Sequence, residues 1–272
     1  MSVLAEERKQ VIKEWLQKDG KVMVIPLSDH LEVSPETIRR DLLALEKEGK
    51  LKRVYGGAIK PTYLNDEAPY SLRQSIHPEE KRAIGLRAAE LIQDGSTIVI
   101  DVGTTTQELA QAIQGKKRLT ILTNSIPVAS TLLESISRGV FTGKVIILGG
   151  EVNPEQSSIS GTLCLQMMAQ FHVDQAFLSV GGISLSSGIT DFDFNEAAVS
   201  RAFAEAAQEV IVLVDHSKLG ITTFAQTIPL HQADIIISST EVPGEWIQEI
   251  DRSGVLWIDA CSMNIEDRGE MK

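Results

Sequence analysis

The sequence is poor in cysteine, in aromatic side chains and in long apolar runs. Its two cysteines, Cys164 and Cys261, form no Cys-x-x-Cys pair and have no histidine close by in sequence. A disulfide framework is therefore excluded, and no spacing is typical of a zinc site, so we expect no metal. No apolar run approaches the roughly 18 residues that a membrane-spanning helix requires, so we expect no membrane contact.

The amino terminus lacks the features of a secretory signal. Glu6 and Glu7 stand where such a signal would carry a basic patch, and no apolar stretch follows them. We therefore expect the protein to be in the cytoplasm. At 272 residues, with 43% hydrophobic and 23% charged residues, the composition is that of a globular protein long enough for two domains.

The chain has too few basic residues to coat nucleic acid along its whole length, because its formal net charge is −11. The negative charge is distributed unevenly along the chain. Residues 1–60 hold 12 lysines and arginines against 10 acids, a balance of +2. The remaining residues therefore carry −13. The two parts of the chain differ electrostatically, which supports two domains.

Residues 1–60 have the pattern of a winged helix-turn-helix. Apolar spacings of three and four predict a helix over residues 6–18, and a shorter helix is predicted over 26–31. Ser34 as a cap and Pro35 at the first position predict a third helix that runs to about residue 48. A hairpin-like segment at 51–58 follows, and residues 61–75, with two prolines and little periodicity, are predicted to be a linker.

Residues 76–272 alternate apolar runs of strand length with helical segments. Because these runs are continuous, they predict strands buried on both faces of a mostly parallel sheet that helices cover. The expected fold class is therefore an α/β domain preceded by a small winged helix-turn-helix. The predicted strands are residues 97–100, 119–123, 145–148, 176–180, 210–214, 234–238 and 255–258.

The predicted third helix has an apolar stripe, formed by Ile38, Leu42 and Leu45, and a polar face. In a helix laid in the DNA major groove, guanidinium groups near the N-terminal turns can reach phosphates or bind guanine through two hydrogen bonds. A surface helix that its arginines merely solvate would show the same periodicity, so the pattern leaves both interpretations open. The candidate DNA contacts are Ser34, Glu36, Thr37, Arg39 and Arg40, with Lys52 and Arg53 assigned to phosphate.

Small polar residues follow five successive predicted strands, at the edge of such a sheet where ligands bind. In residues 103–106, a glycine, three hydroxyls and a helix N-terminus meet the needs of an anion, so we expect a phosphate there. Taken singly, a glycine after a strand is more often a tight turn, and Lys218 a solvated residue. The candidate effector contacts are Asp101, Gly103, Thr104, Thr105, Thr106, Asn124, Ser125, Gly149, Gly150, Gly181, Gly182, Glu196 and Lys218.

Both halves resemble the DeoR family of bacterial regulators. Residues 33–42, followed by Leu45, Gly49, Leu51, Arg53 and Gly56-Gly57-Ala58, are similar to its DNA-binding signature, with Tyr55 where the family usually has histidine. Residues 101–106, 123–125, 188–191 and 215–218 are similar to its sensor domain, although Leu178-Ser179 stands close to where the family commonly has a glycine.

The resemblance implies a sensor fold like that of ribose-5-phosphate isomerase and glucosamine-6-phosphate deaminase. It implies that a phosphorylated sugar or related metabolite is bound, not converted, and that it relieves repression at a double-stranded DNA operator. We also expect a homo-oligomer, a dimer or a tetramer, because one small module of charge +2 would bind DNA too weakly to be specific.

An aldose-ketose isomerase or deaminase is the alternative, with Asp191, Asp193 and Glu196 as candidate general bases. Isomerases of the related fold carry an acidic pair in the loop after the fourth strand, where residues 179–182 contain no acid. We therefore expect no catalytic residue and no cofactor. Glu196 serves equally well as a first-turn acid, and a scaffold with a vestigial pocket would bind no metabolite. The histidines His77, His172 and His231 are scattered and receive no role.

Overall fold

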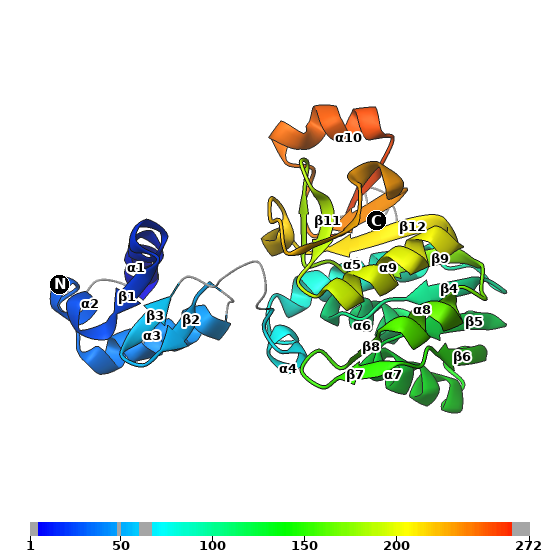
Figure 1. Cartoon of the computed structure of the whole chain (residues 1–272), viewed down its shortest axis with the longest axis horizontal. Coiled ribbons are helices and arrows are strands. Elements are labelled where there is room, and N and C mark those ends of the chain that lie inside the picture. Colours follow the sequence, from blue (N-terminus) through cyan, green and yellow to red (C-terminus); the bar gives the residue numbers. More distant parts are fainter. Residues whose placement is uncertain (1–4, 48–49, 60–66, 263–272) are drawn as a thin grey trace, which may run out of the picture. The chain divides into compact units, whose positions relative to one another are not determined.

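The computed structural model describes residues 5–47, 50–59 and 67–262. The chain forms two compact units, Met1–Ala68 and Pro69–Lys272 (Figure 1). Among the described helices, none combines the length and the hydrophobicity needed to cross a bilayer.

The first unit contains the three predicted helices and the wing, and their inward faces form its core. The side chains of Ile12, Leu27, Ile38 and Leu45 are fully inaccessible to solvent. A third strand, β1, pairs with β3 of the wing and completes a small antiparallel sheet in the order β1-β3-β2. The elements are α1 (Ala5–Asp19), β1 (Lys21–Met23), α2 (Val24–His30), α3 (Pro35–Lys47), β2 (Lys52–Val54) and β3 (Gly57–Ile59).

The second unit is built on a seven-stranded sheet in the order β15-β14-β12-β9-β4-β5-β6, in which every pair of neighbours is parallel. Each strand overlaps one of the seven predicted apolar runs, although β6, β9 and β12 begin two or three residues earlier than predicted, and this confirms the α/β fold class. The strands are β4 (Thr97–Ile100), β5 (Leu119–Thr123), β6 (Gly143–Ile147), β9 (Val173–Leu178), β12 (Ala207–Val214), β14 (Ile235–Ser238) and β15 (Leu256–Asp259).

Helices cover both faces of this sheet and create two apolar cores (Figure 1). Strand β4 contributes to both, because Val99 faces one core while Ile98 and Ile100 face the other. One face is covered by α5 (Pro78–Glu90), α6 (Thr104–Ala112) and α7 (Ile126–Ser137), and the other by α8 (Thr162–Met168), α9 (Phe194–Ala206) and α10 (Ile247–Ser253).

Burial on both faces was a wrong expectation for the two outermost strands. Ile147 of β6 is 45% exposed and Leu256 of β15 is 56% exposed. An edge strand has a neighbour on one side only, so helices cover it less completely. Five short antiparallel strands also escaped prediction, namely β7 (Glu151–Asn153), β8 (Ser158–Ser160), β10 (Gly182–Ser184), β11 (Gly188–Asp191) and β13 (Ala225–Ile228).

The segment predicted as a linker differs from the structure over its last residues. Helix α4 (Tyr70–Arg73) belongs to the second unit, where Tyr70 is buried and its N–H donates to the carbonyl of Glu155 at 2.9 Å. Arg73 donates to the side-chain oxygen of Gln156 at 2.6 Å. These contacts fix residues 69–75 to the hairpin β7–β8, whereas residues 61–66 lie outside the described part of the chain.

Candidate functional site

Helix α3 presents its arginines to solvent because its apolar stripe is buried. Ile38 and Leu42 are at most 1% exposed, whereas the side chains of Arg39 and Arg40 lie on the open face. At the helix start, Ser34 Oγ accepts the N–H of Thr37 at 3.2 Å, as an N-cap does. The helix therefore begins where the sequence predicted and leaves its first turns accessible.

The cationic groups of this surface differ in how they are held. Arg39 is paired with Glu36 at 3.0 Å, and Arg53 with Glu46 at 2.6 Å. Arg40 makes no ion pair within the residues that the structure describes. A guanidinium without an acidic partner needs no rearrangement before it meets an anion, so Arg40 is the most directly available of the predicted DNA contacts. Lys52 lies in β2, but its side chain is outside the described part.

A groove lies between α3 and the wing, and two guanidinium groups line it. It has a volume of about 350 Å³. Tyr55, at the turn between β2 and β3, is fully exposed, so the position that departs from the expected histidine still presents an aromatic side chain with a polar tip. The groove is lined by Val24, Arg39, Leu42, Arg53, Val54, Tyr55, Gly56 and Gly57.

In the second unit, the strand order reverses between β4 and β9. The chain runs outward from β4 through β5 to β6, and then returns to the other side of β4 to build β9, β12, β14 and β15. Ligands of open α/β sheets bind where the order reverses, at the carboxyl ends of the strands. Asp101 follows β4 and Ser179 follows β9 at this point, and the N–H of Asp101 donates to the carbonyl of Phe177.

Asp101 is 1% exposed and accepts several hydrogen bonds, one of them from the backbone of Ser179. Its Oδ2 accepts the hydroxyl of Ser200 on α9 at 2.6 Å, and its Oδ1 accepts the N–H of Val102 at 2.8 Å. Burial raises the pKa of Asp101 to about 7, against these hydrogen bonds, and the charge of Asp191 adds to the increase. The site thus holds a carboxyl group that is half protonated near neutral pH.

The predicted phosphate loop, residues 103–106, is buried and closely packed. A Cβ at Gly103 would lie 2.4 Å from Oγ of Ser179, which itself donates to the carbonyl of Val102. Only glycine therefore fits at this position. Thr104 and Thr105 are 6% and 7% exposed at the first turn of α6, where the backbone N–H groups have no acceptor within the helix. An anion bound here would have to displace what covers the loop.

Asn124 and Ser125 follow β5 and lie beneath the β7–β8 hairpin. The carbonyl of Asn124 accepts the N–H of Ile159 at 2.8 Å, and Ser125 bridges to Ser158. Neither polar atom of the Asn124 side chain, which is fully buried, makes a hydrogen bond to a described residue. That amide is consequently available to a ligand. Ser125 Oγ instead caps α7 by accepting the N–H of Val128.

All three carboxylates that could have acted as general bases have structural partners. Asp193 caps α9 through the N–H groups of Asn195 and Glu196. Glu196 is 4% exposed and accepts the hydroxyl of Ser158 at 2.5 Å, so it ties α9 to the hairpin. Asp191 accepts the N–H of Phe192 at 2.6 Å and lies near Asp101.

Lys218 lies beside Asp215, after β12, and its ammonium is 5.3 Å from the ring centroid of Phe192. Burial alone would raise the pKa of Asp215, but the hydroxyl of Ser217 and the charges of Lys218 and Lys81 hold it below its usual value. Lys218 thus forms part of a charged group at the carboxyl end of β12, which β9 separates from β4, the strand that Asp101 follows.

The two predicted glycine pairs have packing roles of their own. A Cβ at Gly150 would lie 2.3 Å from the carbonyl of Ser160, and one at Gly182 would lie 2.5 Å from that of Ile221. Gly181 packs against the ring of Phe192, near Lys218. Gly149 and Gly150 are exposed after the edge strand β6. Of the two pairs, Gly181-Gly182 is therefore the one that lies near Asp191 and Lys218.

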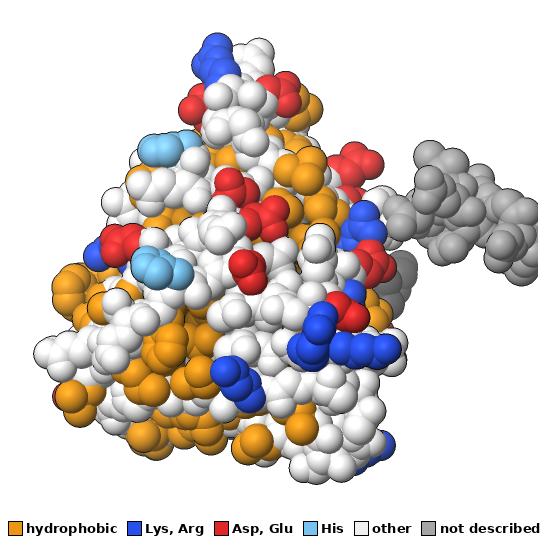
Figure 2. Space-filling view, turned by 90° about the vertical axis from the view of Figure 1, so that its right-hand side faces the viewer, with side chains coloured by type: hydrophobic (Ala, Val, Ile, Leu, Met, Phe, Trp, Pro, Cys, Tyr) orange, Lys and Arg blue, Asp and Glu red, His pale blue; other side chains and the backbone are white. Residues whose placement is uncertain are grey.

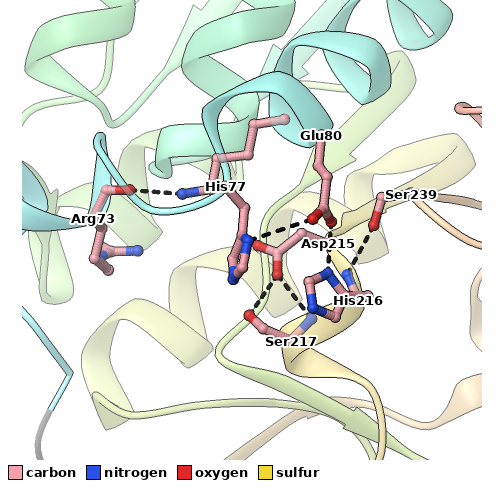
Figure 3. Close-up of polar contacts among 8 residues, drawn as sticks. Arg73, His77, Glu80, Asp215, His216, Ser217 and Ser239 are labelled. Carbon is pink, nitrogen blue, oxygen red and sulfur yellow. Dashed lines mark hydrogen bonds and ion pairs between the residues drawn. The ribbon is translucent and has the colours of Figure 1, made fainter. Parts of the chain in front are cut away.

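Sequence reasoning missed several polar partners of this region. Ser158, Ser179 and Ser200 each bond a predicted site residue or its neighbour, yet an isolated serine carries no local signal. It also gave no role to His77, which lies beside Glu80 and His216 at the carboxyl end of β12 (Figure 3). On the face shown in Figure 2, acidic side chains stand among the basic ones, in keeping with the surplus of acids outside the first 60 residues.

A helix with two exposed arginines in one unit and a polar strand-end site in the other define a class of protein, a DNA-binding regulator with a small-molecule sensor. Residues 8–63 match the DeoR-like helix-turn-helix domain, and residues 76–240 match the DeoR C terminal sensor domain. The chain belongs to the DeoR family and is a DNA-binding transcriptional regulator.

Curated relatives match most of the chain. The HTH-type transcriptional repressor GlcR of Bacillus subtilis is 35% identical over 250 residues, covering 92% of this chain and 94% of the relative. The glycerol-3-phosphate regulon repressor of Escherichia coli is 32% identical over 237 residues, covering 87% and 92%. These relatives are regulators, which answers the enzyme alternative: this chain is a regulator and not an enzyme.

Solved structures with a similar sheet are more distant. Ribose 5-phosphate isomerase A of Methanocaldococcus jannaschii is 15% identical, with a TM-score of 0.38 over 52% of this chain and 54% of that one. RipA of Yersinia pestis is 14% identical, with a TM-score of 0.42 over 64% and 51%.

Proposed function

We propose that this regulator represses genes of carbohydrate metabolism by binding a double-stranded operator as a homo-oligomer, and that a phosphorylated sugar or related metabolite modulates this binding. The observation that carries the proposal is the placement of three features at the carboxyl ends of parallel strands of one sheet: a helix N-terminus with three threonines after β4, the unpaired amide of Asn124 after β5, and the charged Lys218 after β12. Such a set complements an anion carrying hydroxyl groups. The names of the relatives, which include a glycerol-3-phosphate regulon repressor, support the same ligand class.

The contacts around the site suggest how occupancy reaches the DNA-binding unit. The β7–β8 hairpin covers Asn124 and is bonded to α4, the first helix after the junction between the units. Because the phosphate loop is buried, a ligand can enter only if a neighbouring segment moves. We infer that this segment is the β7–β8 hairpin, which is hydrogen-bonded both to Asn124 and to α4. A ligand that prefers the shifted arrangement would change the population competent for operator binding by its differential affinity.

The division of labour is testable with two substitutions. Operator duplexes are first selected from a random-sequence library with the full chain. Arg40→Ala should weaken binding to the selected duplex about 10- to 100-fold, because one base or phosphate contact is worth about 1–3 kcal/mol. It should leave the response to sugar phosphates unchanged. Lys218→Ala should keep duplex affinity and lose that response.

The response is measured as a thermal shift with glycerol 3-phosphate, ribose 5-phosphate and glucose 6-phosphate, each beside its unphosphorylated counterpart. A shift for the phosphorylated compound only is expected. Equal damage by either substitution to both activities would show that the two units do not divide the work. Turnover of any of these compounds would contradict the assignment as a regulator.

A further inference from the structure

Two imidazoles and one carboxylate meet beside the segment that carries Asp215 (Figure 3). His77 and Glu80 come from the start of α5 and His216 from the turn after β12, yet one ligand-type atom of each lies within 4.8 Å of the others. Glu80 Oε2 is 2.7 Å from Nδ1 of His216, and its Oε1 is 3.4 Å from Nδ1 of His77. The chain thus converges three metal-ligand groups from segments far apart in sequence.

We propose that His77, Glu80 and His216 bind one divalent transition-metal ion, with zinc the best match. Two nitrogens and one oxygen are a zinc donor set, and three protein ligands leave a fourth position for water or a small ligand. Calcium and magnesium prefer oxygen ligands throughout. Tetrahedral zinc needs donor atoms about 3.4 Å apart. The Glu80–His216 pair, now at 2.7 Å, would therefore open slightly, and the most widely spaced pair, at up to 4.8 Å, would close by about 1.4 Å.

The backbone and the surrounding polar groups already orient these side chains. His77 adopts the left-handed conformation, with φ 49° and ψ 48°, immediately before Pro78 at the first position of α5. A non-glycine residue reaches this conformation only when its surroundings hold it there. Ser239 Oγ accepts the N–H of His216 at 2.9 Å, and it is also hydrogen-bonded to Glu80. Outer hydrogen bonds of this kind orient ligands in metal sites.

The alternative is a hydrogen-bonded trio that carries a proton instead of a metal. Such a trio would be expected to have all of its polar atoms hydrogen-bonded. The His77 imidazole does not meet this expectation, because its Nε2 is buried without a partner among the described residues. The neighbouring cation, the ammonium of Lys81, is directed away from the trio. Lys81 is 5% exposed, and its ammonium donates to the carbonyl of Arg73 at 2.7 Å. The carboxylate of Asp215 lies near that ammonium and offsets its charge.

The proposal does not depend on the proposed function, since the metal is detected directly. Tag-free full-length protein carrying Cys261→Ser, which removes an exposed thiol, is titrated with zinc chloride by calorimetry and with cobalt chloride by visible spectroscopy at about pH 7.5. One ion per chain and the intense bands of four-coordinate cobalt are expected. His77→Ala, Glu80→Gln and His216→Ala should each weaken zinc binding at least tenfold.

Matched controls are His172→Ala and His231→Ala, which remove histidines outside the trio and should bind zinc as the parent does. The proposal is overturned if the parent binds no zinc, if the double variant of His77 and His216 binds it equally well, or if cobalt gives only weak six-coordinate bands. The parent's cobalt spectrum decides the matter even where a variant fails to fold.

Discussion

Asp101→Asn should make the stability of the protein less sensitive to pH. The carboxyl group of Asp101 is 1% exposed, and burial raises its pKa from 3.8 to about 7. In the unfolded chain the same group is ionised above about pH 4. Its contribution to folding is thus fully present below the unfolded pKa and is lost as the pH rises through the folded value.

The size of the effect follows from the difference between the two pKa values. Linkage gives a loss of about 2.5 kcal/mol of unfolding free energy between roughly pH 5 and pH 8, as the folded state gives up the proton that it holds longer than the unfolded state does. Asparagine keeps the shape and an acceptor for the hydroxyl of Ser200 but cannot ionise. The free-energy gap between variant and wild type should therefore shift by about 2.5 kcal/mol in favour of the variant over that interval.

Denaturant unfolding of both full-length proteins at the two pH values measures this shift. Asp174→Asn, which removes an exposed acid from the same unit, calibrates the general effect of losing one negative charge. Asp191→Asn should lower the pKa of Asp101 by removing a neighbouring charge, and so reduce the shift without abolishing it. Parallel pH profiles for Asp101→Asn and wild type would refute the reasoning.

Two further substitutions test the packing of each unit. Gly103→Ala should cost about 2 kcal/mol of unfolding free energy, because its Cβ would lie 2.4 Å from Ser179 Oγ; adding Ser179→Gly should recover most of this, and no recovery would locate the strain elsewhere. Arg8→Ala should destabilise the first unit by about 3 kcal/mol, since Asp41, whose side chain is 9% exposed, would lose its partner at 2.7 Å. Calorimetry that showed the second unit melting earlier instead would contradict that assignment.

The long elements of the fold could be predicted because burial imposes a pattern on consecutive residues. The five inner strands between two layers of helices must be apolar on both faces, and each left a continuous run in the sequence. The edge strand β6 has the same kind of run, including Ile147, but sequence cannot reveal that a strand lies at an edge. The antiparallel pieces are three or four residues long, too short for periodicity to register.

The candidate site was predictable only as far as strand ends reveal it. Asp101 and Asn124 could be chosen because each directly follows a strand. Their partners could not: the bond from Ser200 to Asp101 spans 99 positions, and that from Ser158 to Glu196 spans 38. The pairing of His216 with Glu80 spans 136 positions. Tertiary contacts of this kind depend on how helices dock on the sheet, which no local pattern encodes.

The reversal of strand order beside β4 has a consequence for how such a sensor can change. The candidate site lies where the two halves of the sheet meet, and its polar groups belong to the turns that follow the central strands. The outer strands β6 and β15 do not adjoin β4 or β9. Substitutions in those turns can change which molecule is recognised while the strands stay the same, as long as close-packed positions such as Gly103 are kept. One architecture can in this way serve many chemical signals.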